Sequence, residues 1–92
     1  MARDYLLKEL KAHKVSIVEV EYVIAFGFEF AVEVNPDTLN ERVMYVGFAP
    51  NREKLLEVGV EHMPNGDEWI FHTMEATGEW EAAFNEEAGN LI

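Results

Sequence analysis

FEFAVEV, residues 28–34, alternates large apolar side chains with glutamate and alanine over seven consecutive positions. A period of two residues is the spacing of side chains on one face of a β-strand. The stretch therefore predicts a strand with Phe28, Phe30 and valines directed inward and an acidic face in water. This strand decides the fold class, because segments with helical spacing come before it and further strands come after it.

Three more strands are predicted after the first, and each pair of strands is separated by turn residues. They are 42–49 (RVMYVGFA), 55–61 (LLEVGVE) and 69–74 (WIFHTM). Asparagine, proline and glycine between these segments favour tight turns, with Pro64-Asn65-Gly66-Asp67 as a hairpin signal. Short connections predict an antiparallel meander of four strands. Within it, Gly47 is expected to mark a bulge or a close approach of two backbones.

Two helices are predicted before the sheet. Residues 4–13 (DYLLKELKAH) place leucines at helical spacing opposite charged side chains. Residues 17–26 follow Ser16, which with Glu19 forms a capping-box pattern. Gly27 is expected to end this helix in the left-handed conformation.

A last helix is predicted at the C-terminal end, capped by Thr77 and closed by Gly89, with Trp80 and Phe84 on one face. The chain is thus expected to be α+β, with two N-terminal helices, a four-stranded antiparallel meander and a C-terminal helix. The helices are expected to cover one face of the sheet. The other face would carry alternate side chains in water: Glu29, Glu33, Met44, Glu57 and Glu61.

Composition limits the classes of function. The 92 residues, 49% of them apolar, suit one small domain over residues 1–92. The chain has no cysteine and no apolar run of the roughly 18 residues that span a bilayer, so a cytoplasmic, soluble protein is expected. Its net charge of −11 argues against direct binding of nucleic acid or of acidic membranes.

Candidate catalytic residues are few. His13, His62 and His72 lie in different predicted elements, without the spacing of a metal site, so no metal or other cofactor is expected. His72, on a strand, is the most interesting histidine, as a general base or as a sheet-surface side chain. We find neither a nucleophile elbow nor a glycine-rich phosphate loop in the sequence.

Several short segments resemble the BrnT family of small ribonuclease toxins. They are His13-Lys14-Val15-Ser16 before a helix, residues 42–48, 55–60 and 70–87, and the Ala76-Thr77 step into the last helix, with Phe84 at a commonly aromatic position. The resemblance implies a RelE-like fold and a toxin–antitoxin context. Family members surround the Ala-Thr step with arginines that hold RNA phosphates. This chain instead has Met74, Glu75, Gly78, Glu79 and Glu81 there.

The missing arginines favour binding over catalysis, so the chain is more readily interpreted as a non-enzyme. Our first hypothesis is a non-catalytic, inhibitory or binding module that uses its acidic last helix to hold a basic protein partner. The residues expected to contact that partner are Glu75, Glu79, Trp80, Glu81, Glu86 and Glu87.

Two other functions stay open. A toxin-type endoribonuclease would use Arg42, Arg52, Lys54 and His72 in place of the family's arginines. An acidic nucleic-acid mimic would need carboxylates spaced like duplex phosphates on one face. A homodimer is a further possibility if the strand over residues 28–34 lies at the edge of the sheet.

Overall fold

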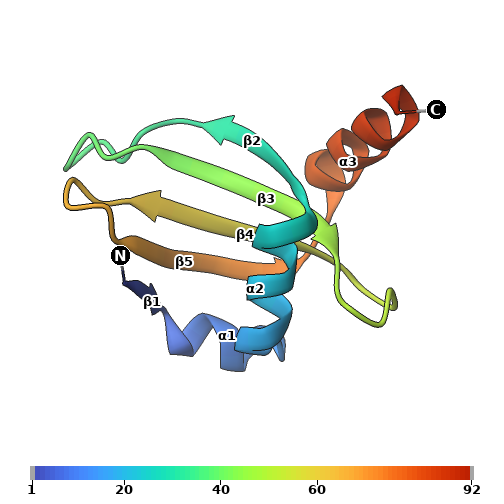
Figure 1. Cartoon of the computed structure of the whole chain (residues 1–92), viewed down its shortest axis with the longest axis horizontal. Coiled ribbons are helices and arrows are strands. Elements are labelled where there is room, and N and C mark those ends of the chain that lie inside the picture. The colour runs from blue at the N-terminus through green and yellow to red at the C-terminus, as the bar shows by residue number, and fades with distance from the viewer. Residues whose placement is uncertain (1, 92) are drawn as a thin grey trace.

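All five strands belong to one mixed sheet, and three helices pack around it (Figure 1). The computed structural model describes residues 2–91. The strands are β1 (Arg3–Tyr5), β2 (Phe28–Val32), β3 (Arg42–Phe48), β4 (Leu55–His62) and β5 (Glu68–Glu75); the helices are α1 (Leu7–His13), α2 (Ile17–Phe26) and α3 (Gly78–Asn90). The spatial order is β1-β5-β4-β3-β2.

The meander from β2 to β5 is antiparallel as predicted, but the sheet has a fifth strand that the sequence pattern did not show. Residues 3–5 form β1, parallel to β5, so the prediction of a helix from residue 4 is wrong at its start. The amide of Leu6 donates to the carbonyl of Ile70 at 2.9 Å, and Arg3 pairs with Glu68. These partners lie more than sixty residues away, where local periodicity carries no signal.

Helix α2 has the predicted bounds and the predicted cap. Its N-cap, Ser16, accepts a hydrogen bond from the Glu19 amide at 3.1 Å, and the Glu19 carboxylate accepts one from the Ser16 amide at 2.9 Å. The two bonds satisfy amides that a helix start otherwise leaves free.

Gly27 ends α2, but not in the left-handed conformation that we expected. Its φ of −79° and ψ of 175° are extended, which any residue can adopt. A Cβ at this position would lie 2.6 Å from the Val23 carbonyl oxygen and 2.8 Å from that of Val46. Glycine is therefore needed here because the end of α2 approaches the backbone of β3 closely. The predicted close approach at Gly47 is the β3 side of this contact, since a Cβ at Gly47 would lie 2.8 Å from Gly27 Cα.

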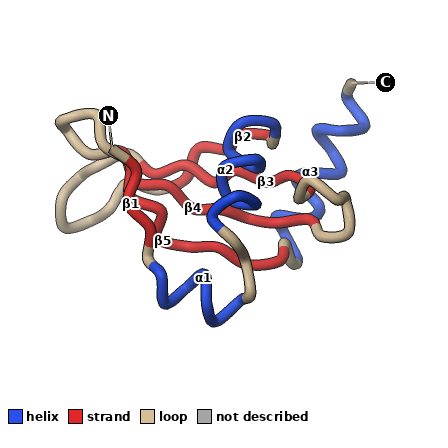
Figure 2. Tube along the Cα trace, turned by 60° about the horizontal axis from the view of Figure 1, so that its bottom comes forward, coloured by secondary structure: helices blue, strands red, loops and turns tan. Residues whose placement is uncertain are grey.

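Helices pack on both faces of the sheet, which corrects the expectation of one covered face: α2 lies over one face, and α3 packs Trp80 and Phe84 against the other before it projects beyond the end of the sheet (Figures 1 and 2). We call the face that packs against α2 the α2 face; it carries Tyr45, Val58 and Ile70. We call the other the α3 face, because Met44 and Val46 pack there with side chains of α3.

The predicted water-facing set is split by this arrangement. Glu29 is exposed on the α2 face, and Glu33 lies exposed beyond β2. Met44, Glu57 and Glu61 lie on the α3 face but are buried, with 8%, 5% and 4% of their surface exposed. The expectation of a solvated acidic face is therefore wrong for these three residues.

The C-terminal half has a register shift that was not predicted and a last helix whose cap and end differ from prediction. The pairing of β4 with β5 shifts at Gly59/Val60, and the Phe71 ring lies where a Gly59 Cβ would be, at 2.8 Å. Thr77 occupies the N-cap of α3 without a side-chain hydrogen bond to any described residue, and the helix continues through Gly89 to Asn90. None of the helices within residues 2–91 has the length and apolar character needed to cross a bilayer.

Candidate functional site

An aromatic groove of about 280 Å³ lies where the end of α2, the start of β2 and the end of β3 meet α3. Its walls come from α2 and α3, which pack on opposite faces of the sheet. Phe48 and Arg52 also line the groove, so it lies at the end of the sheet near the β3–β4 turn. We define the aromatic groove by these lining residues: Tyr22, Phe26, Phe28, Phe48, Arg52, Phe84 and Ala88.

The rings of the groove form two contacting groups. Tyr22 and Phe26 lie 4.7 Å apart between ring centroids on α2, while Phe84 of α3 contacts Phe28 at 5.3 Å and Phe48 at 5.4 Å. Phe26 is 74% exposed although it borders these rings. An exposed aromatic ring beside a hollow of other rings is a common feature of interaction sites.

Helix α3 lines this groove with Phe84 and Ala88, and the exposed side chains of Glu81 and Glu87 each lie about one helical turn from Phe84. Trp80 is half-buried against Phe30, at 5.7 Å between ring centroids, so the indole points toward the sheet rather than toward water. With 3.6 residues per turn, Glu79 and Glu81 lie about 100° to either side of Trp80. The predicted contact residues that are exposed are Glu75, Glu79, Glu81, Glu86 and Glu87.

The charge around the groove is strongly one-sided. Every lysine and arginine lies at or before Lys54, so β4, β5 and α3 contain none. Arg52 is the cation that lines the groove, and its guanidinium carbon lies 5.0 Å from the Phe48 ring centroid. On the α3 side, the groove is lined by the apolar side chains of Phe84 and Ala88, and all charged side chains of that helix are exposed glutamates.

The four residues of the endoribonuclease hypothesis are not brought together. Arg42 begins β3, whereas Arg52 and Lys54 lie beyond its end, and a seven-residue strand spans about 20 Å. Lys54 approaches the Glu19 carboxylate at 3.6 Å and the Lys14 carbonyl oxygen at 3.3 Å, on the α2 side. The cations thus do not form one phosphate-binding cluster.

His72 lies between two carboxylates on the α3 face. Its Nε2 is 2.7 Å from Glu57 Oε2, and its Nδ1 is 3.3 Å from Glu9 Oε1 of α1. The other oxygen of Glu57 accepts a hydrogen bond from the Thr77 amide at 3.2 Å. His72 of β5 and buried Glu57 therefore connect α1, β4 and the start of α3.

Glu61 is the most thoroughly satisfied carboxylate of the sheet. It accepts hydrogen bonds from Asn35 at 2.9 Å, Asn40 at 3.0 Å and Arg42 at 2.8 Å. Burial alone would raise the pKa of Glu61, but the bonds from Asn40, Asn35 and Arg42 outweigh burial, and the pKa lies below its ordinary value. The Arg42 guanidinium also lies over the Phe71 ring, at 4.6 Å.

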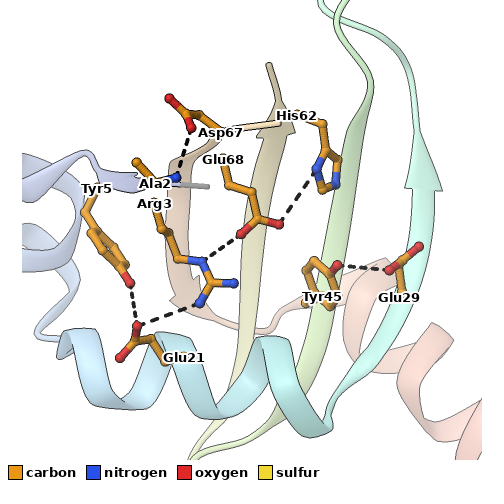
Figure 3. A network of polar contacts seen from close by, with 9 residues as sticks. All are labelled: Ala2, Arg3, Tyr5, Glu21, Glu29, Tyr45, His62, Asp67 and Glu68. Atoms are coloured by element: carbon orange, nitrogen blue, oxygen red, sulfur yellow. Dashed lines mark hydrogen bonds and ion pairs between the residues drawn. The ribbon is translucent and has the colours of Figure 1, made fainter. Parts of the chain in front are cut away.

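Glu68 is also a buried carboxylate that accepts a hydrogen bond from an arginine, but it lies on the α2 face, where Figure 3 shows a network of polar side chains. Arg3 donates to Glu68 at 2.8 Å and approaches Glu21 of α2 at 3.7 Å, so it joins β1 to β5 and to the helix. Tyr45 donates to Glu29 at 2.9 Å in the same view. Burial and this bond raise the pKa of Tyr45 to about 12.

These contacts separate structural from available carboxylates. Glu57, Glu61 and Glu68 are buried and paired, so they are not part of a surface array that could imitate nucleic-acid phosphates. Within residues 2–91, no group of three or more metal-ligating side chains is placed to hold an ion. The sequence indicated an acidic last helix, but it did not show that Tyr22 and Phe26, in the predicted helix over residues 17–26, border a groove.

No protein-family model matches the chain, and no curated protein matches it significantly.

Proposed function

We propose that the chain is a non-catalytic protein-binding module on a BrnT-like scaffold, and that the aromatic groove and the exposed glutamates of α3 bind a basic partner. The observation that carries this proposal is the exposed ring of Phe26 beside a groove lined in part by α3, a helix whose charged side chains are all exposed glutamates. An apolar floor with a charged rim is the arrangement by which proteins anchor and orient a partner.

The chemistry of the groove favours an amphipathic segment with positive charge. Leucine or aromatic side chains of the partner would enter between Phe26 and Phe84. Lysine or arginine side chains would lie beside Glu79 and Glu81. An amphipathic helix presents both kinds of side chain on adjacent faces, so the expected occupant is a basic amphipathic helix of a partner protein.

A defined probe tests this chemistry directly. We would titrate a 14-residue amphipathic peptide of leucine and lysine into the protein by isothermal titration calorimetry. A peptide with glutamate in place of lysine and one with the same residues in scrambled order serve as controls. Saturable binding of the lysine peptide alone is expected, and equal binding of all three would overturn the proposal.

Two variants assign the binding to the groove. Phe26→Ser removes the exposed ring without opening the core and should weaken the lysine peptide at least tenfold, which is about 1.4 kcal/mol. Val18→Ser removes an exposed apolar side chain, 68% exposed, from the same helix two turns away and should leave the affinity unchanged. Equal losses in both variants would place the binding elsewhere on α2.

The non-catalytic part of the proposal has its own test. Arg42, Arg52, Lys54 and His72 point to different neighbours, and Arg42 is bonded to Glu61. Purified protein is therefore expected to leave a labelled RNA intact at low and at physiological salt. Cleavage that is lost in His72→Gln would contradict a purely binding role.

A further inference from the structure

Strand β2 forms one edge of the sheet, and no described strand pairs with its outer side (Figure 1). Natural proteins usually protect such edges with lysine, proline or a bulge, because free amides and carbonyls can pair with another chain. β2 (FEFAV) contains no lysine or proline, and its pairing with β3 is regular over all five residues. Its one charged side chain, Glu29, lies on the α2 face and bonds to Tyr45.

We propose that β2 pairs antiparallel with β2 of a second copy of this chain, with Phe30 opposite Phe30 on the two-fold axis. The two sheets then become one continuous sheet. The occupant of the edge is the chain itself because one register matches the side chains on both faces. This inference does not rest on the proposed function: it uses the outer edge of β2, although Phe28 of that strand also lines the aromatic groove.

The register follows from charge and size. With Phe30 on the axis, Phe28 faces Val32 of the second copy on one side of the sheet, and Glu29 faces Ala31 on the other. With Ala31 on the axis, Glu29 would face Glu33, and with Glu29 on the axis it would face itself. Directly opposed like charges are destabilising, so the Phe30 register is favoured over its two neighbours.

The surface beside Ala31 has room for the longer side chain of Glu29 from the second copy. A shallow groove of about 380 Å³ runs along β2 there, lined by Ala31, Val34, Glu41 and Val43 among others. Ala31 is exposed, and Val34 is 45% exposed although it is apolar. Pairing at the edge would cover both.

The net charge of −11 on each copy opposes association at long range. Added salt screens this repulsion, because the Debye length falls from about 10 Å at 0.1 M to about 3 Å at 1 M. The dimer should therefore tighten as salt increases, unlike the proposed complex with a basic partner, which should weaken. The opposite signs separate the two interactions experimentally.

Two charge variants at one exposed position test the register. Ala31→Lys would face Glu29 of the second copy and should tighten the dimer at least tenfold, as measured by sedimentation equilibrium. Ala31→Glu would face the same residue and should weaken it at least tenfold. A protein that is monomeric up to millimolar concentration, or equal dissociation constants for the two variants, would overturn the proposal.

Charge variants at Val18 control for the position of the substitution, and a disulfide cross-link tests the register. Val18→Lys and Val18→Glu make the same charge changes on α2, and a dimer that responds to them instead would lie on the helix. Because the chain has no cysteine, Ala31→Cys mixed with Glu29→Cys should give an oxidised heterodimer. A disulfide formed between two copies of Ala31→Cys would indicate the Ala31 register and contradict ours.

Discussion

The glutamates of the sheet and the glutamates of α3 are the same residue type in opposite environments. Glu57, Glu61 and Glu68 are at most 8% exposed, and each is bonded to a cation, a histidine or a backbone amide. Those of α3 are exposed, and none makes a side-chain hydrogen bond or ion pair with a described residue: Glu79, Glu81, Glu86 and Glu87.

The difference shows which acids the fold depends on. A buried carboxylate costs several kcal/mol unless it is bonded, so removing its partner should harm the fold. An exposed carboxylate on a helix of which no residue is buried contributes little to stability and is free for a partner. Substitutions that affect the buried acids should therefore change mainly stability, and substitutions of the exposed acids of α3 should change mainly binding.

The largest effect on stability is expected for Arg42→Ala. The change leaves Glu61 buried, with its two asparagines but without its cation, and should lower the free energy of unfolding by about 3 kcal/mol. Urea denaturation followed by circular dichroism measures the loss. Arg52→Ala removes an equal charge from an exposed turn and should cost less than about 1 kcal/mol; similar losses for both would contradict the structural role of Glu61.

The pH dependence of stability should identify Glu61 in a second way. Its folded-state pKa lies below that of the unfolded chain, so its contribution is present above about pH 4.3, the ordinary value for glutamate, and is lost as pH falls through the folded value. Denaturant midpoints measured between pH 6 and pH 2 should show this loss in the wild type. Glu61→Gln should lack it, and Glu81→Gln on α3 should keep it.

A buried hydroxyl of the sheet offers a smaller change of opposite sign. Thr73 is 1% exposed, and its Oγ1 has no hydrogen-bond partner among the described residues. Thr73→Val keeps the shape and removes an unsatisfied group, so it should stabilise the protein by about 1 kcal/mol. A destabilised Thr73→Val in thermal unfolding would mean that the hydroxyl is satisfied in solution.

The smallest effect on stability is expected on α3. Glu79→Lys with Glu81→Lys should lower the free energy of unfolding by only about 0.5 kcal/mol, because both side chains are exposed and unpaired with described residues and only their favourable position in the first turn of the helix dipole is lost. The same chemical denaturation experiment measures it. A loss comparable to that of Arg42→Ala would remove the distinction between the two regions.

Local sequence signals predicted the parts of the fold that local chemistry decides. The period of two in β2, the capping box at Ser16 and the turn around Gly66 all have short-range causes, and these elements are where the sequence placed them, except that β2 ends at Val32 and not at the predicted residue 34. Strand β1 was missed because its partner, β5, lies at the other end of the chain. The burial of Glu57 was missed because it depends on the start of α3, where the Thr77 amide bonds to it, and that of Glu61 because it depends on Asn35 and Asn40 of the β2–β3 loop.

The acidic charge of the candidate site could be predicted from the sequence, but the aromatic groove could not. A run without lysine or arginine is visible in the sequence, so the acidic charge of α3 was expected. The aromatic groove requires Phe26 of α2 and Phe84 of α3 to lie on either side of the end of β3, which only the folded chain shows. Trp80 was the expected anchor, yet it packs against Phe30, and Phe26 is the more exposed ring.

One ratio of affinities tests the central claim, that the free acids of α3 hold a basic partner. The leucine and lysine peptide would be titrated into Glu79→Lys/Glu81→Lys and into Glu33→Lys/Asp37→Lys, which makes the same change of net charge at exposed positions after β2, at the other end of the sheet (Figure 1). The account predicts a dissociation constant at least tenfold higher for the α3 variant. Equal dissociation constants would show that only net charge attracts the peptide, and would contradict the account.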